Sequence, residues 1–317
     1  PGQTTIKCAA GGTYGALQVL DLPLRNGETS ITNVVVRGIT FDGNFSGAAY
    51  SGHPLILASG NGDCLYENLV CQHSSHYGLG LQNGGHVGVT VQDCLFYDCW
   101  RDGIDVKNNE NTSGDSIGDQ LKFHNLTFRN CCRGVDGSNP LAILDIMSPR
   151  VAISNIHIDD IPTDATATIN AGIRVKLGLD GDSIGRGVGG QYCTISNVHI
   201  TKDAGSVTVS NGIAAWAPYV SISNAKIVGA FTEGIQLAQS YCNVVNSTVS
   251  GAVTGINVRA LVGATTDAYP FTGADDCQII GNSLISCTTG LSNTRGRTLI
   301  GYNNFSSCTT GLAASAS

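Results

Sequence analysis

The chain of 317 residues contains 41 glycines, and only 13 % of its residues are charged. Its hydrophobic content of 42 % is enough for a folded core, which excludes a disordered chain. The net charge of −7 argues against a general nucleic-acid binder, and no run of about 18 apolar residues predicts a membrane-spanning helix. A glycine-rich, charge-poor sequence with many β-branched residues is typical of short strands joined by tight turns.

Residues 1–62 are expected to form the first coils of a repeating structure, and residues 63–317 its regular coils with long loops. Within the first part, residues 32–43 alternate apolar and polar side chains and then turn, which is typical of half-buried strands. The chain opens on Pro1, with no methionine before it, so we expect it to be a fragment of a longer chain. We expect residues 1–317 to form a single domain.

From residue 78 onward one short pattern recurs: a glycine, a buried aliphatic residue, an exposed residue and a second aliphatic residue. The copies begin at Gly78, Gly103, Gly134, Gly172, Gly212, Gly234, Gly255, Gly290 and Gly311. Each is preceded by another short strand, often headed by asparagine, as at Asn68 and Asn125. The shorter intervals between copies range from 21 residues, as from Gly234 to Gly255, to 25 residues, from Gly78 to Gly103, the length of one β-solenoid coil with three short strands. No helical period is sustained, so the sequence predicts an all-β solenoid.

Successive side chains of a strand point to opposite faces, so the two aliphatic residues of each copy are predicted to face the core. The residue after each glycine would then stack in one ladder, made of Leu79, Ile104, Val135, Ile173, Ile213, Ile235, Ile256, Leu291 and Leu312. We call the sheet that these strands form the post-glycine sheet. Each coil buries its apolar face only against its neighbours, so stability is expected to be spread along the axis.

The opposite face of the post-glycine sheet carries charged and aromatic residues where a structural sheet would more often carry Thr, Ser and Asn. The row consists of Asp105, Lys107, Asp136, Arg174, Lys176, Trp216, Gln236, Asn257 and Arg259. Long polar insertions at about 107–120, 137–150, 176–191 and 259–276 flank this sheet. Insertions that collect on one face of a repeat protein often wall a binding groove, so this face is the predicted functional site.

The twelve cysteines follow the repeat, and Cys287 and Cys308 occupy the same pentapeptide one coil apart. We interpret them as small buried hydrophobic residues stacked in ladders. Disulfides between neighbouring coils are the alternative, because adjacent strands lie only ~4.8 Å apart. No Cys-x-x-Cys zinc pattern is present in the sequence.

The asparagine-headed strands, the stretch Val34–Gly43 and the 21-residue coils resemble the right-handed parallel β-helix superfamily. More narrowly, they are similar to the pectate-lyase-3-like modules, part of the pectin-lyase-like group, of phage tailspikes and secreted polysaccharide-degrading enzymes, over about residues 30–312. The resemblance implies a right-handed, single-stranded parallel β-helix that acts on a polysaccharide, outside the cell or on a virion. It also implies a homotrimer. Neither nucleic acid nor membrane insertion is expected.

Two short stretches, Asp102-Gly-Ile-Asp105 and Arg174-Val-Lys176, are also similar to motifs of polygalacturonases. The Asp-Asp pair and the Gly-His-Gly motif of that family have no counterpart in the coils between them. The resemblance to polygalacturonases is therefore confined to these two stretches.

Hydrolysis of a glycosidic bond usually needs two carboxyl groups, one as acid and one as base or nucleophile. Asp105 and Asp136 occupy equivalent positions in successive copies of the pattern, so we predict that they form this pair, with Asp102 as a third member. A close pair of carboxyl groups would raise the pKa of one of them, as a general acid requires. The alternative is that these acids only solvate an exposed sheet or pair with Lys107 and Arg133.

Lyase chemistry instead needs a base and a cation that neutralises the substrate carboxylate. Arg174 and Lys176 are the candidates for the cationic part, because an arginine fork binds a carboxylate at two points. A local basic row in a chain of net charge −7 suggests an anionic saccharide. The alternative is a row of solvated long side chains.

Further residues of the predicted site would bind the substrate. Trp216 is expected to stack on a sugar ring or to contact another subunit, because an outward-facing aromatic exposes apolar area. The other candidates are Gln236, Asn257, Arg259, Glu233, Lys107, Tyr219 and His76. No cofactor or metal is predicted, although Asp180 and Asp182 offer the oxygen ligands that calcium prefers.

The predicted function is binding and depolymerisation of an extended, acidic polysaccharide, by a glycoside hydrolase or a polysaccharide lyase. The alternative is a non-catalytic glycan-binding adhesin or a structural spike of a virion or cell surface. An enzyme requires a close carboxyl pair, or a cluster of carboxylate, arginine and tyrosine, on the outward face. An adhesin requires only aromatic and neutral polar groups there.

Overall fold

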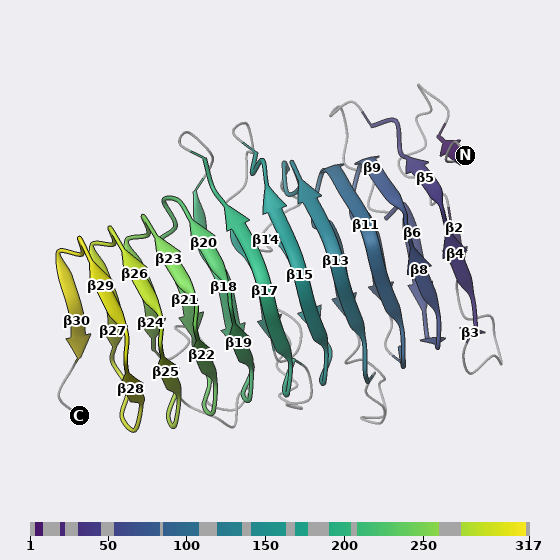
Figure 1. Ribbon diagram of the computed structural model, residues 1–317. Coiled ribbons are helices and arrows are strands. Elements are labelled where there is room, and N and C mark those ends of the chain that lie inside the picture. Colours follow the sequence, from purple (N-terminus) through teal and green to yellow (C-terminus); the bar gives the residue numbers. More distant parts are fainter. Residues whose placement is uncertain are drawn as a thin grey trace.

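The computed structural model describes residues 4–8, 20–22, 31–45, 54–82, 85–107, 119–134, 141–162, 169–176, 190–203, 208–259 and 274–314. Within these ranges every regular element is a β-strand, and the strands lie side by side in a long stack of coils (Figure 1). No helix among the described residues could cross a lipid bilayer.

The post-glycine sheet runs along the whole stack, and all of its strand pairs are parallel. Its strands, in spatial order, are β2 (Leu20–Leu22), β6 (Ile56–Ser59), β10 (Leu79–Gln82), β12 (Ile104–Lys107), β14 (Leu141–Met147), β16 (Ile169–Lys176), β18 (Val209–Trp216), β21 (Glu233–Leu237), β24 (Thr254–Val258), β27 (Thr289–Asn293) and β30 (Thr310–Ala314).

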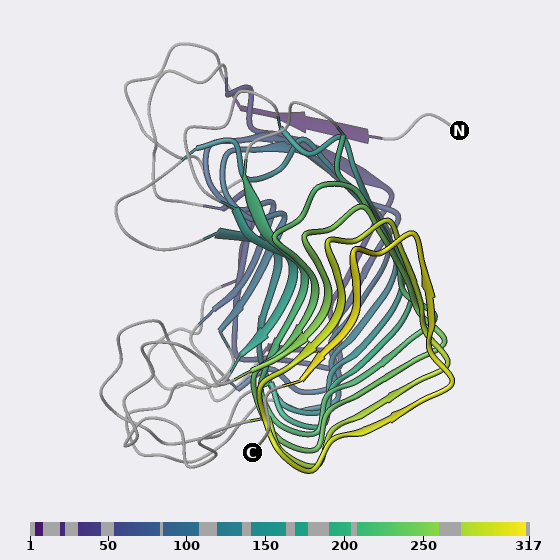
Figure 2. The same cartoon turned by 90° about the vertical axis from the view of Figure 1, so that its left-hand side faces the viewer.

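A second sheet, which we call the bent sheet, closes the other side of each coil with two strand segments (Figure 2). Its strands are β1 (Thr4–Lys7), β4 (Val35–Arg37), β5 (Ile39–Asp42), β8 (Leu65–Glu67), β9 (Val70–Ser74), β11 (Thr90–Cys99), β13 (Lys122–Arg129), β15 (Ala152–Asp159), β17 (Thr194–Thr201), β19 (Ser221–Ser223), β20 (Lys226–Val228), β22 (Asn243–Val245), β23 (Thr248–Ser250), β25 (Gln278–Ile280), β26 (Ser283–Ile285), β28 (Leu299–Gly301) and β29 (Asn304–Ser306). A third, two-stranded sheet pairs β3 (Ile31–Thr32) with β7 (Asn61–Gly62).

Residues with positive φ recur at the bends of this second sheet and explain the asparagines that head its strands. Asn68, Asn125, Asn155 and Asn197 have φ of 51°, 52°, 54° and 53°. This left-handed conformation is disfavoured for most side chains, and asparagine tolerates it better than other non-glycine residues. Each such residue turns the backbone once, so that one coil supplies two segments to the bent sheet.

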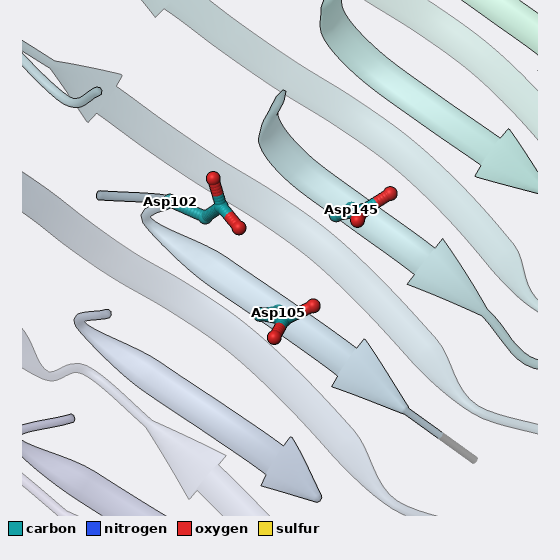
Figure 3. Close-up of side chains that lie close together, drawn as sticks. All are labelled: Asp102, Asp105 and Asp145. Atoms are coloured by element: carbon teal, nitrogen blue, oxygen red, sulfur yellow. The ribbon is translucent and has the colours of Figure 1, made fainter. Parts of the chain in front are cut away.

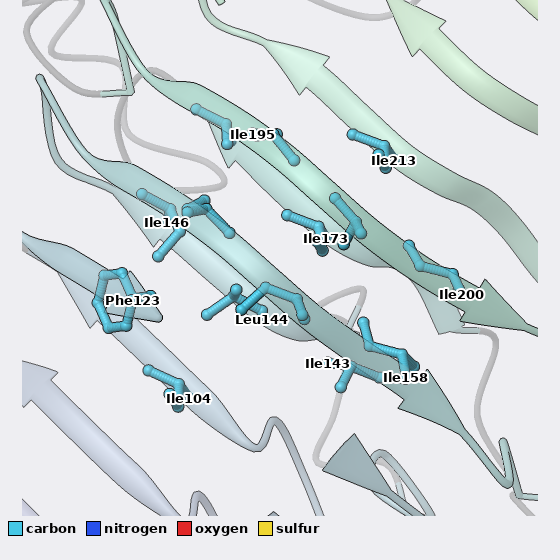
Figure 4. Packing of buried hydrophobic residues seen from close by; sticks show 14 of the residues in the cluster. Ile104, Phe123, Ile143, Leu144, Ile146, Ile158, Ile173, Ile195, Ile200 and Ile213 are labelled. Atoms are coloured by element: carbon cyan, nitrogen blue, oxygen red, sulfur yellow. The ribbon is translucent and has the colours of Figure 1, made fainter. Parts of the chain in front are cut away.

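The core lies between the two sheets and consists of aliphatic ladders (Figure 4). The register places Leu79 beside Ile104 and Ile173 beside Ile213. The same ladder continues through Ile235, Ile256, Leu291 and Leu312, as predicted. Each fully buried aliphatic side chain contributes roughly 1.5–3 kcal/mol, and most of its contacts are within its own coil and the two adjacent ones.

One rung of the predicted ladder is wrong. The residue beside Ile104 is Leu144 of β14, not Val135, which lies outside the described residues. Ile143 occupies the position that glycine holds in the other coils from β10 onward, so a pattern that requires glycine assigns Gly134 to this coil instead. The error displaces the outward-facing residues of this coil as well.

The eleven cysteines from Cys64 to Cys308 are free thiols, and ten of them are buried. Most follow directly after a residue with positive φ, as Cys94 follows Asp93 and Cys242 follows Tyr241. From this position the thiol reaches a carbonyl oxygen of the preceding coil, at 3.7 Å from Cys94 to Tyr66 and 3.3 Å from Cys242 to Ala217. The interpretation as small buried side chains in ladders is confirmed.

Candidate active site on the post-glycine sheet

Three outward positions on each strand of the post-glycine sheet carry the polar side chains. They are the residue before the glycine position, the second residue after it and the fourth residue after it. The middle row reads Gly80, Asp105, Asp145, Arg174, Ala214, Gln236, Asn257 and Ser292 along the sheet. The charged residues of this middle row therefore gather on β12, β14 and β16.

Three aspartates form a compact group at this place, which we call the acid cluster (Figure 3). Asp102 precedes β12, Asp105 lies within it, and Asp145 lies beside Asp105 on β14. One carboxylate oxygen of each lies within 4.8 Å of one from each of the others, and the three residues are 3 %, 1 % and 3 % exposed. Three carboxylates this close cannot all ionise at ordinary cost, so their environments must differ.

Asp145 is held ionised by two cations of β16. The Arg174 guanidinium donates from Nε to Oδ1 at 2.9 Å and from Nη2 to Oδ2 at 2.7 Å, and Lys176 Nζ lies 3.2 Å from Oδ2. Burial by itself would raise the pKa of Asp145, but the charges and hydrogen bonds of Arg174 and Lys176 hold that pKa well below its usual range. Arg174 is itself only 2 % exposed, so this is a buried, two-point ion pair.

The pKa of Asp102 is shifted in the opposite direction from that of Asp145. Burial, followed by the nearby charge of Asp105, raises the pKa of Asp102 to about 8. Its Oδ1 accepts hydrogen bonds from the Ala142 backbone N–H at 3.2 Å and from the Cys132 thiol at 3.7 Å, which leaves Oδ2 to carry the proton. At neutral pH Asp102 is therefore a protonated acid beside two carboxylates.

Asp105 is surrounded by hydrogen-bond donors. Gln82 Nε2 donates to its Oδ2 at 3.0 Å, and Lys107 Nζ lies 3.4 Å from the same oxygen. The Tyr77 hydroxyl also bonds to Asp105, and the Arg101 guanidinium lies 5.1 Å from the centre of the Tyr77 ring. Burial, and then the charges of Asp105 and Asp102, raise the pKa of Tyr77 far above its ordinary value, so its hydroxyl stays neutral and donates.

The charges around the acid cluster leave an excess of positive charge. Among the described residues, and with Asp102 protonated, two carboxylates face four cations, namely Arg101, Lys107, Arg174 and Lys176. The oxygen set alone would suit a hard metal ion, but ammonium and guanidinium groups already contact the oxygens of Asp105 and Asp145. The calcium ligands considered above, Asp180 and Asp182, lie outside the described residues.

A second polar group lies farther along the same face, on β18, β21 and β24. Arg259 Nη2 is 3.0 Å from Glu233 Oε1, and Asn257 Nδ2 donates to the same oxygen at 2.9 Å. Trp216 donates from Nε1 to Gln236 Oε1 at 2.6 Å. These five predicted substrate-binding residues thus form two groups, three residues around Glu233 and the pair of Trp216 and Gln236.

Trp216 is half-buried, and its ring is fixed in place. It packs against Ala142, Ala171 and Ala214, and the Arg174 guanidinium lies 5.5 Å from its ring centre. Arg174 therefore links the acid cluster to the second polar group.

The two remaining substrate-binding candidates lie elsewhere. His76 is buried and packs against Tyr77, with ring centres 3.7 Å apart, at the edge of the acid cluster. Tyr219 lies at the corner after β18, in a stack with Tyr192 and Tyr241 at ring-centre distances of 4.7 and 4.8 Å. Tyr219 is thus part of a corner ladder and not of the outward row.

The predicted partner of Asp105 is also changed by the register. Asp145, and not Asp136, lies beside Asp105, and Asp136 is outside the described residues. Asp102, Asp105, Arg174 and Lys176 lie together around the acid cluster, where Arg174 and Lys176 both contact Asp145. Sequence reasoning missed Asp145, Tyr77 and Gln82; the near-continuous apolar run of residues 141–147 is the signal that could have marked the strand that contains Asp145.

Comparisons with known proteins concern the fold. No described protein family matches the chain by sequence, and no curated protein does. The tailspike protein of E. coli bacteriophage HK620, solved as a double mutant, superposes with a TM-score of 0.59 at 11 % identity. The match covers 99 % of this chain and 57 % of the tailspike chain, so the chain spans little more than half of that protein.

Two further solved structures have similar folds. An alginate lyase from Paenibacillus sp. superposes with a TM-score of 0.57 at 14 % identity, covering 99 % of both chains. PfbA, a surface adhesin of Streptococcus pneumoniae, gives a TM-score of 0.52 at 15 % identity, covering 96 % of this chain and 67 % of that one. The parallel register and these likenesses together confirm the expected architecture: the chain folds as a right-handed parallel β-helix.

Proposed function

We propose that the protein binds an extended, acidic polysaccharide along the post-glycine sheet and hydrolyses it at the acid cluster. One observation carries the proposal: within a group of three buried aspartates, one is protonated at neutral pH and another is locked in its ionised form. Pairs of titratable groups whose environments drive their pKa values apart are the mark of acid and base roles.

Asp102 is the proposed general acid, which donates its proton to the glycosidic oxygen as the bond breaks. Asp105 is the proposed base or nucleophile, with Tyr77, Gln82 and Lys107 fixing the orientation of its carboxylate. Asp145 is a positioning residue, because its ion pair with Arg174 places a fixed negative charge beside both other carboxyl groups. The excess positive charge around the cluster supports an anionic sugar unit at this point.

A lyase reaction is the second candidate, and Tyr77 is the observation that favours it. Tyr77 lies against Asp105 and Arg101, the combination of carboxylate, arginine and tyrosine that proton abstraction beside a uronate would use. The alginate lyase likeness is consistent with it at the level of fold. The raised pKa of Tyr77 makes this side chain a poor base, however, so hydrolysis is the preferred reaction.

The three carboxyl groups are almost fully buried, while the Lys107 side chain beside them is 31 % exposed. Productive binding of a polymer therefore requires the site to open further around Lys107. The tailspike and adhesin likenesses support a setting outside the cell or on a virion, and a homotrimer remains part of the proposal.

The test is an activity assay on a panel of uronic and bacterial capsular polysaccharides. Two products are measured, new reducing ends and the ultraviolet absorbance of an unsaturated sugar. The variants are Asp105→Asn and Asp102→Asn, with Ser292→Ala as the matched control, because Ser292 lies in the same outward row several strands away. Hydrolysis predicts reducing ends without absorbance, a loss of about 10²–10⁴-fold in both aspartate variants, and full activity in the control.

Three outcomes would contradict the proposal. Growth of absorbance would show a lyase. Full activity in Asp105→Asn would remove the acid cluster from the reaction. Binding of a polysaccharide with no cleavage in any member of the panel would leave an adhesin, the non-catalytic alternative.

A further inference from the structure

The second polar group of the post-glycine sheet has unsatisfied hydrogen-bonding capacity. We call it the Glu233 cluster; it consists of Asn211, Glu233, Gln236, Asn257 and Arg259. The register sets Asn211 beside Glu233, and Gln236 beside Asn257. Four strand steps separate β12 from β21 in the sheet, so the cluster lies roughly 19 Å from the acid cluster at ~4.8 Å per step.

Glu233 is engaged through only one of its two oxygens. Both Arg259 and Asn257 contact Oε1, whereas Oε2 is buried and has no hydrogen-bond partner among the described residues. The Glu233 residue is 7 % exposed. A buried carboxylate oxygen without a donor is unfavourable, so Oε2 is open to a donor that a bound ligand would supply.

Three other polar atoms of the cluster are buried in the same way. Asn211 Oδ1, Asn257 Oδ1 and Arg259 Nε have no hydrogen-bond partner within the described part of the chain. The other end of the Asn211 amide is used, since its Nδ2 donates to the Asn170 carbonyl oxygen at 3.0 Å. The cluster thus offers three free acceptors and one free donor to a ligand.

This pattern selects the chemistry of the ligand. A hydroxyl group can donate one hydrogen bond and accept others, so adjacent hydroxyl groups on a ring can satisfy Glu233 Oε2, the two asparagine oxygens and Arg259 Nε together. The charges of Glu233 and Arg259 cancel, which leaves no excess positive charge for a carboxylate. The acid cluster differs in this respect, because its cations outnumber its anions.

We propose that the Glu233 cluster is a separate subsite that binds an uncharged pyranose ring through neighbouring hydroxyl groups. The idea that the same polymer also reaches the acid cluster rests on the proposed function; the binding of a neutral ring does not. If one chain occupies both sites, the substrate is a heteropolysaccharide with an acidic unit at the acid cluster and a neutral unit about four strands away.

Trp216 provides a local reporter of binding, because it is hydrogen-bonded to Gln236 of the cluster. The chain has two tryptophans, so a Trp100→Phe background isolates its fluorescence. Asp105→Asn is included in this background to prevent cleavage. The ligands are neutral oligosaccharides of glucose, galactose, mannose and rhamnose, with oligogalacturonate and oligoglucuronate as charged counterparts of two of these rings.

The proposal predicts a saturable fluorescence change with at least one neutral oligosaccharide. The dissociation constant should rise about tenfold or more in Glu233→Gln, because a hydrogen bond to a charged group contributes that much, and stay unchanged in Asn304→Ala, at an exposed residue of the bent sheet. Asn211→Ala, whose side chain is outside the ion pair, should also weaken binding and serves if Glu233→Gln fails to fold. Circular dichroism and thermal melting verify the fold of each variant.

A response to charged oligosaccharides only, no response to any neutral one, or an unchanged dissociation constant in both cluster variants would overturn the proposal. Ordered water would then satisfy the free acceptors. If only the proposed function is wrong, the outcome differs: neutral oligosaccharides would still bind, but no polysaccharide would be cleaved.

Discussion

Asp102 makes the stability of the protein depend on pH in a direction opposite to most aspartates. Its pKa is about 8 in the folded chain and ~3.9 when unfolded, so the folded state holds the proton more tightly. The stability that this proton confers is fully present below about pH 4 and is lost as the pH rises through 8. The slope is ~1.4 kcal/mol per pH unit, which integrates to roughly 6 kcal/mol over this window.

Asp102→Asn removes this slope with little change of shape. The asparagine Oδ1 can still accept from the Ala142 N–H, and its Nδ2 donates where the carboxyl proton was. The expected result is that the variant gains stability relative to the wild type as the pH rises from 4.5 to 8.5. The measurement is the free energy of unfolding by denaturant titration, with melting temperature as a second readout, at pH steps across this range.

Asp145→Asn is the matched comparison, because the pKa of Asp145 is lowered by Arg174 and Lys176. Its contribution to stability is present above the unfolded pKa of ~3.9 and is lost as the pH falls below it, so this variant should be least stable relative to the wild type at neutral pH. Denaturant titrations extended down to about pH 2 should show Asp145→Asn approaching the wild type only below pH ~3.9, whereas Asp102→Asn gains relative to it between pH 4.5 and 8.5. These two trends together would support the assigned protonation states. Parallel curves for wild type and Asp102→Asn would refute the reasoning.

Two further stability predictions have internal controls. Arg174→Met should lower the free energy of unfolding by about 3–5 kcal/mol, because it leaves Asp145 buried without its bidentate partner. Arg129→Met is the control: the Arg129 side chain is 51 % exposed in its ion pair, so this variant should change the free energy of unfolding by less than about 1 kcal/mol. Equal effects of the two variants in denaturant titration would contradict a buried pair at Arg174. Gly255→Ala should lower the free energy of unfolding by about 1–3 kcal/mol, since an added Cβ would lie 2.5 Å from the Gly290 carbonyl oxygen. Gly296→Ala is the control, because a Cβ at Gly296 would meet nothing within 4 Å. Equal melting temperatures of the two variants would argue against close packing at Gly255. The rate of polysaccharide cleavage should fall above about pH 8 as Asp102 loses its proton, and a pH–rate profile that still rises there would exclude Asp102 as the acid.

Much of the fold could be predicted because the period of two and the repeated glycine constrain the same strands. Ile104, Ile173 and Ile213 were placed in one ladder from sequence alone, and the register agrees. The coil of β14 could not be placed in this way, because Ile143 stands where the other coils from β10 onward have glycine. A rule based on one residue type fails at the coil that departs from it.

The sequence predicts which face of the sheet each side chain of the site occupies, because side chains alternate along a strand. Asp105, Arg174 and Lys176 were assigned to the outward face correctly. What they do there depends on their neighbours in register, and Arg174 is committed to Asp145, a residue that the glycine pattern had hidden. The protonation of Asp102 was beyond sequence reasoning, because it follows from burial and from the distance to a second carboxylate.

The buried cysteines offer a way to follow the unfolding of individual coils of the stack. Burial raises the pKa of Cys94 and of Cys193 to about 12, so neither thiol reacts with an alkylating reagent while its coil is closed. Cysteines occur from Cys64 near one end of the stack to Cys308 near the other. Timed alkylation followed by peptide mass spectrometry would therefore report which coils open first, with no label added to the chain.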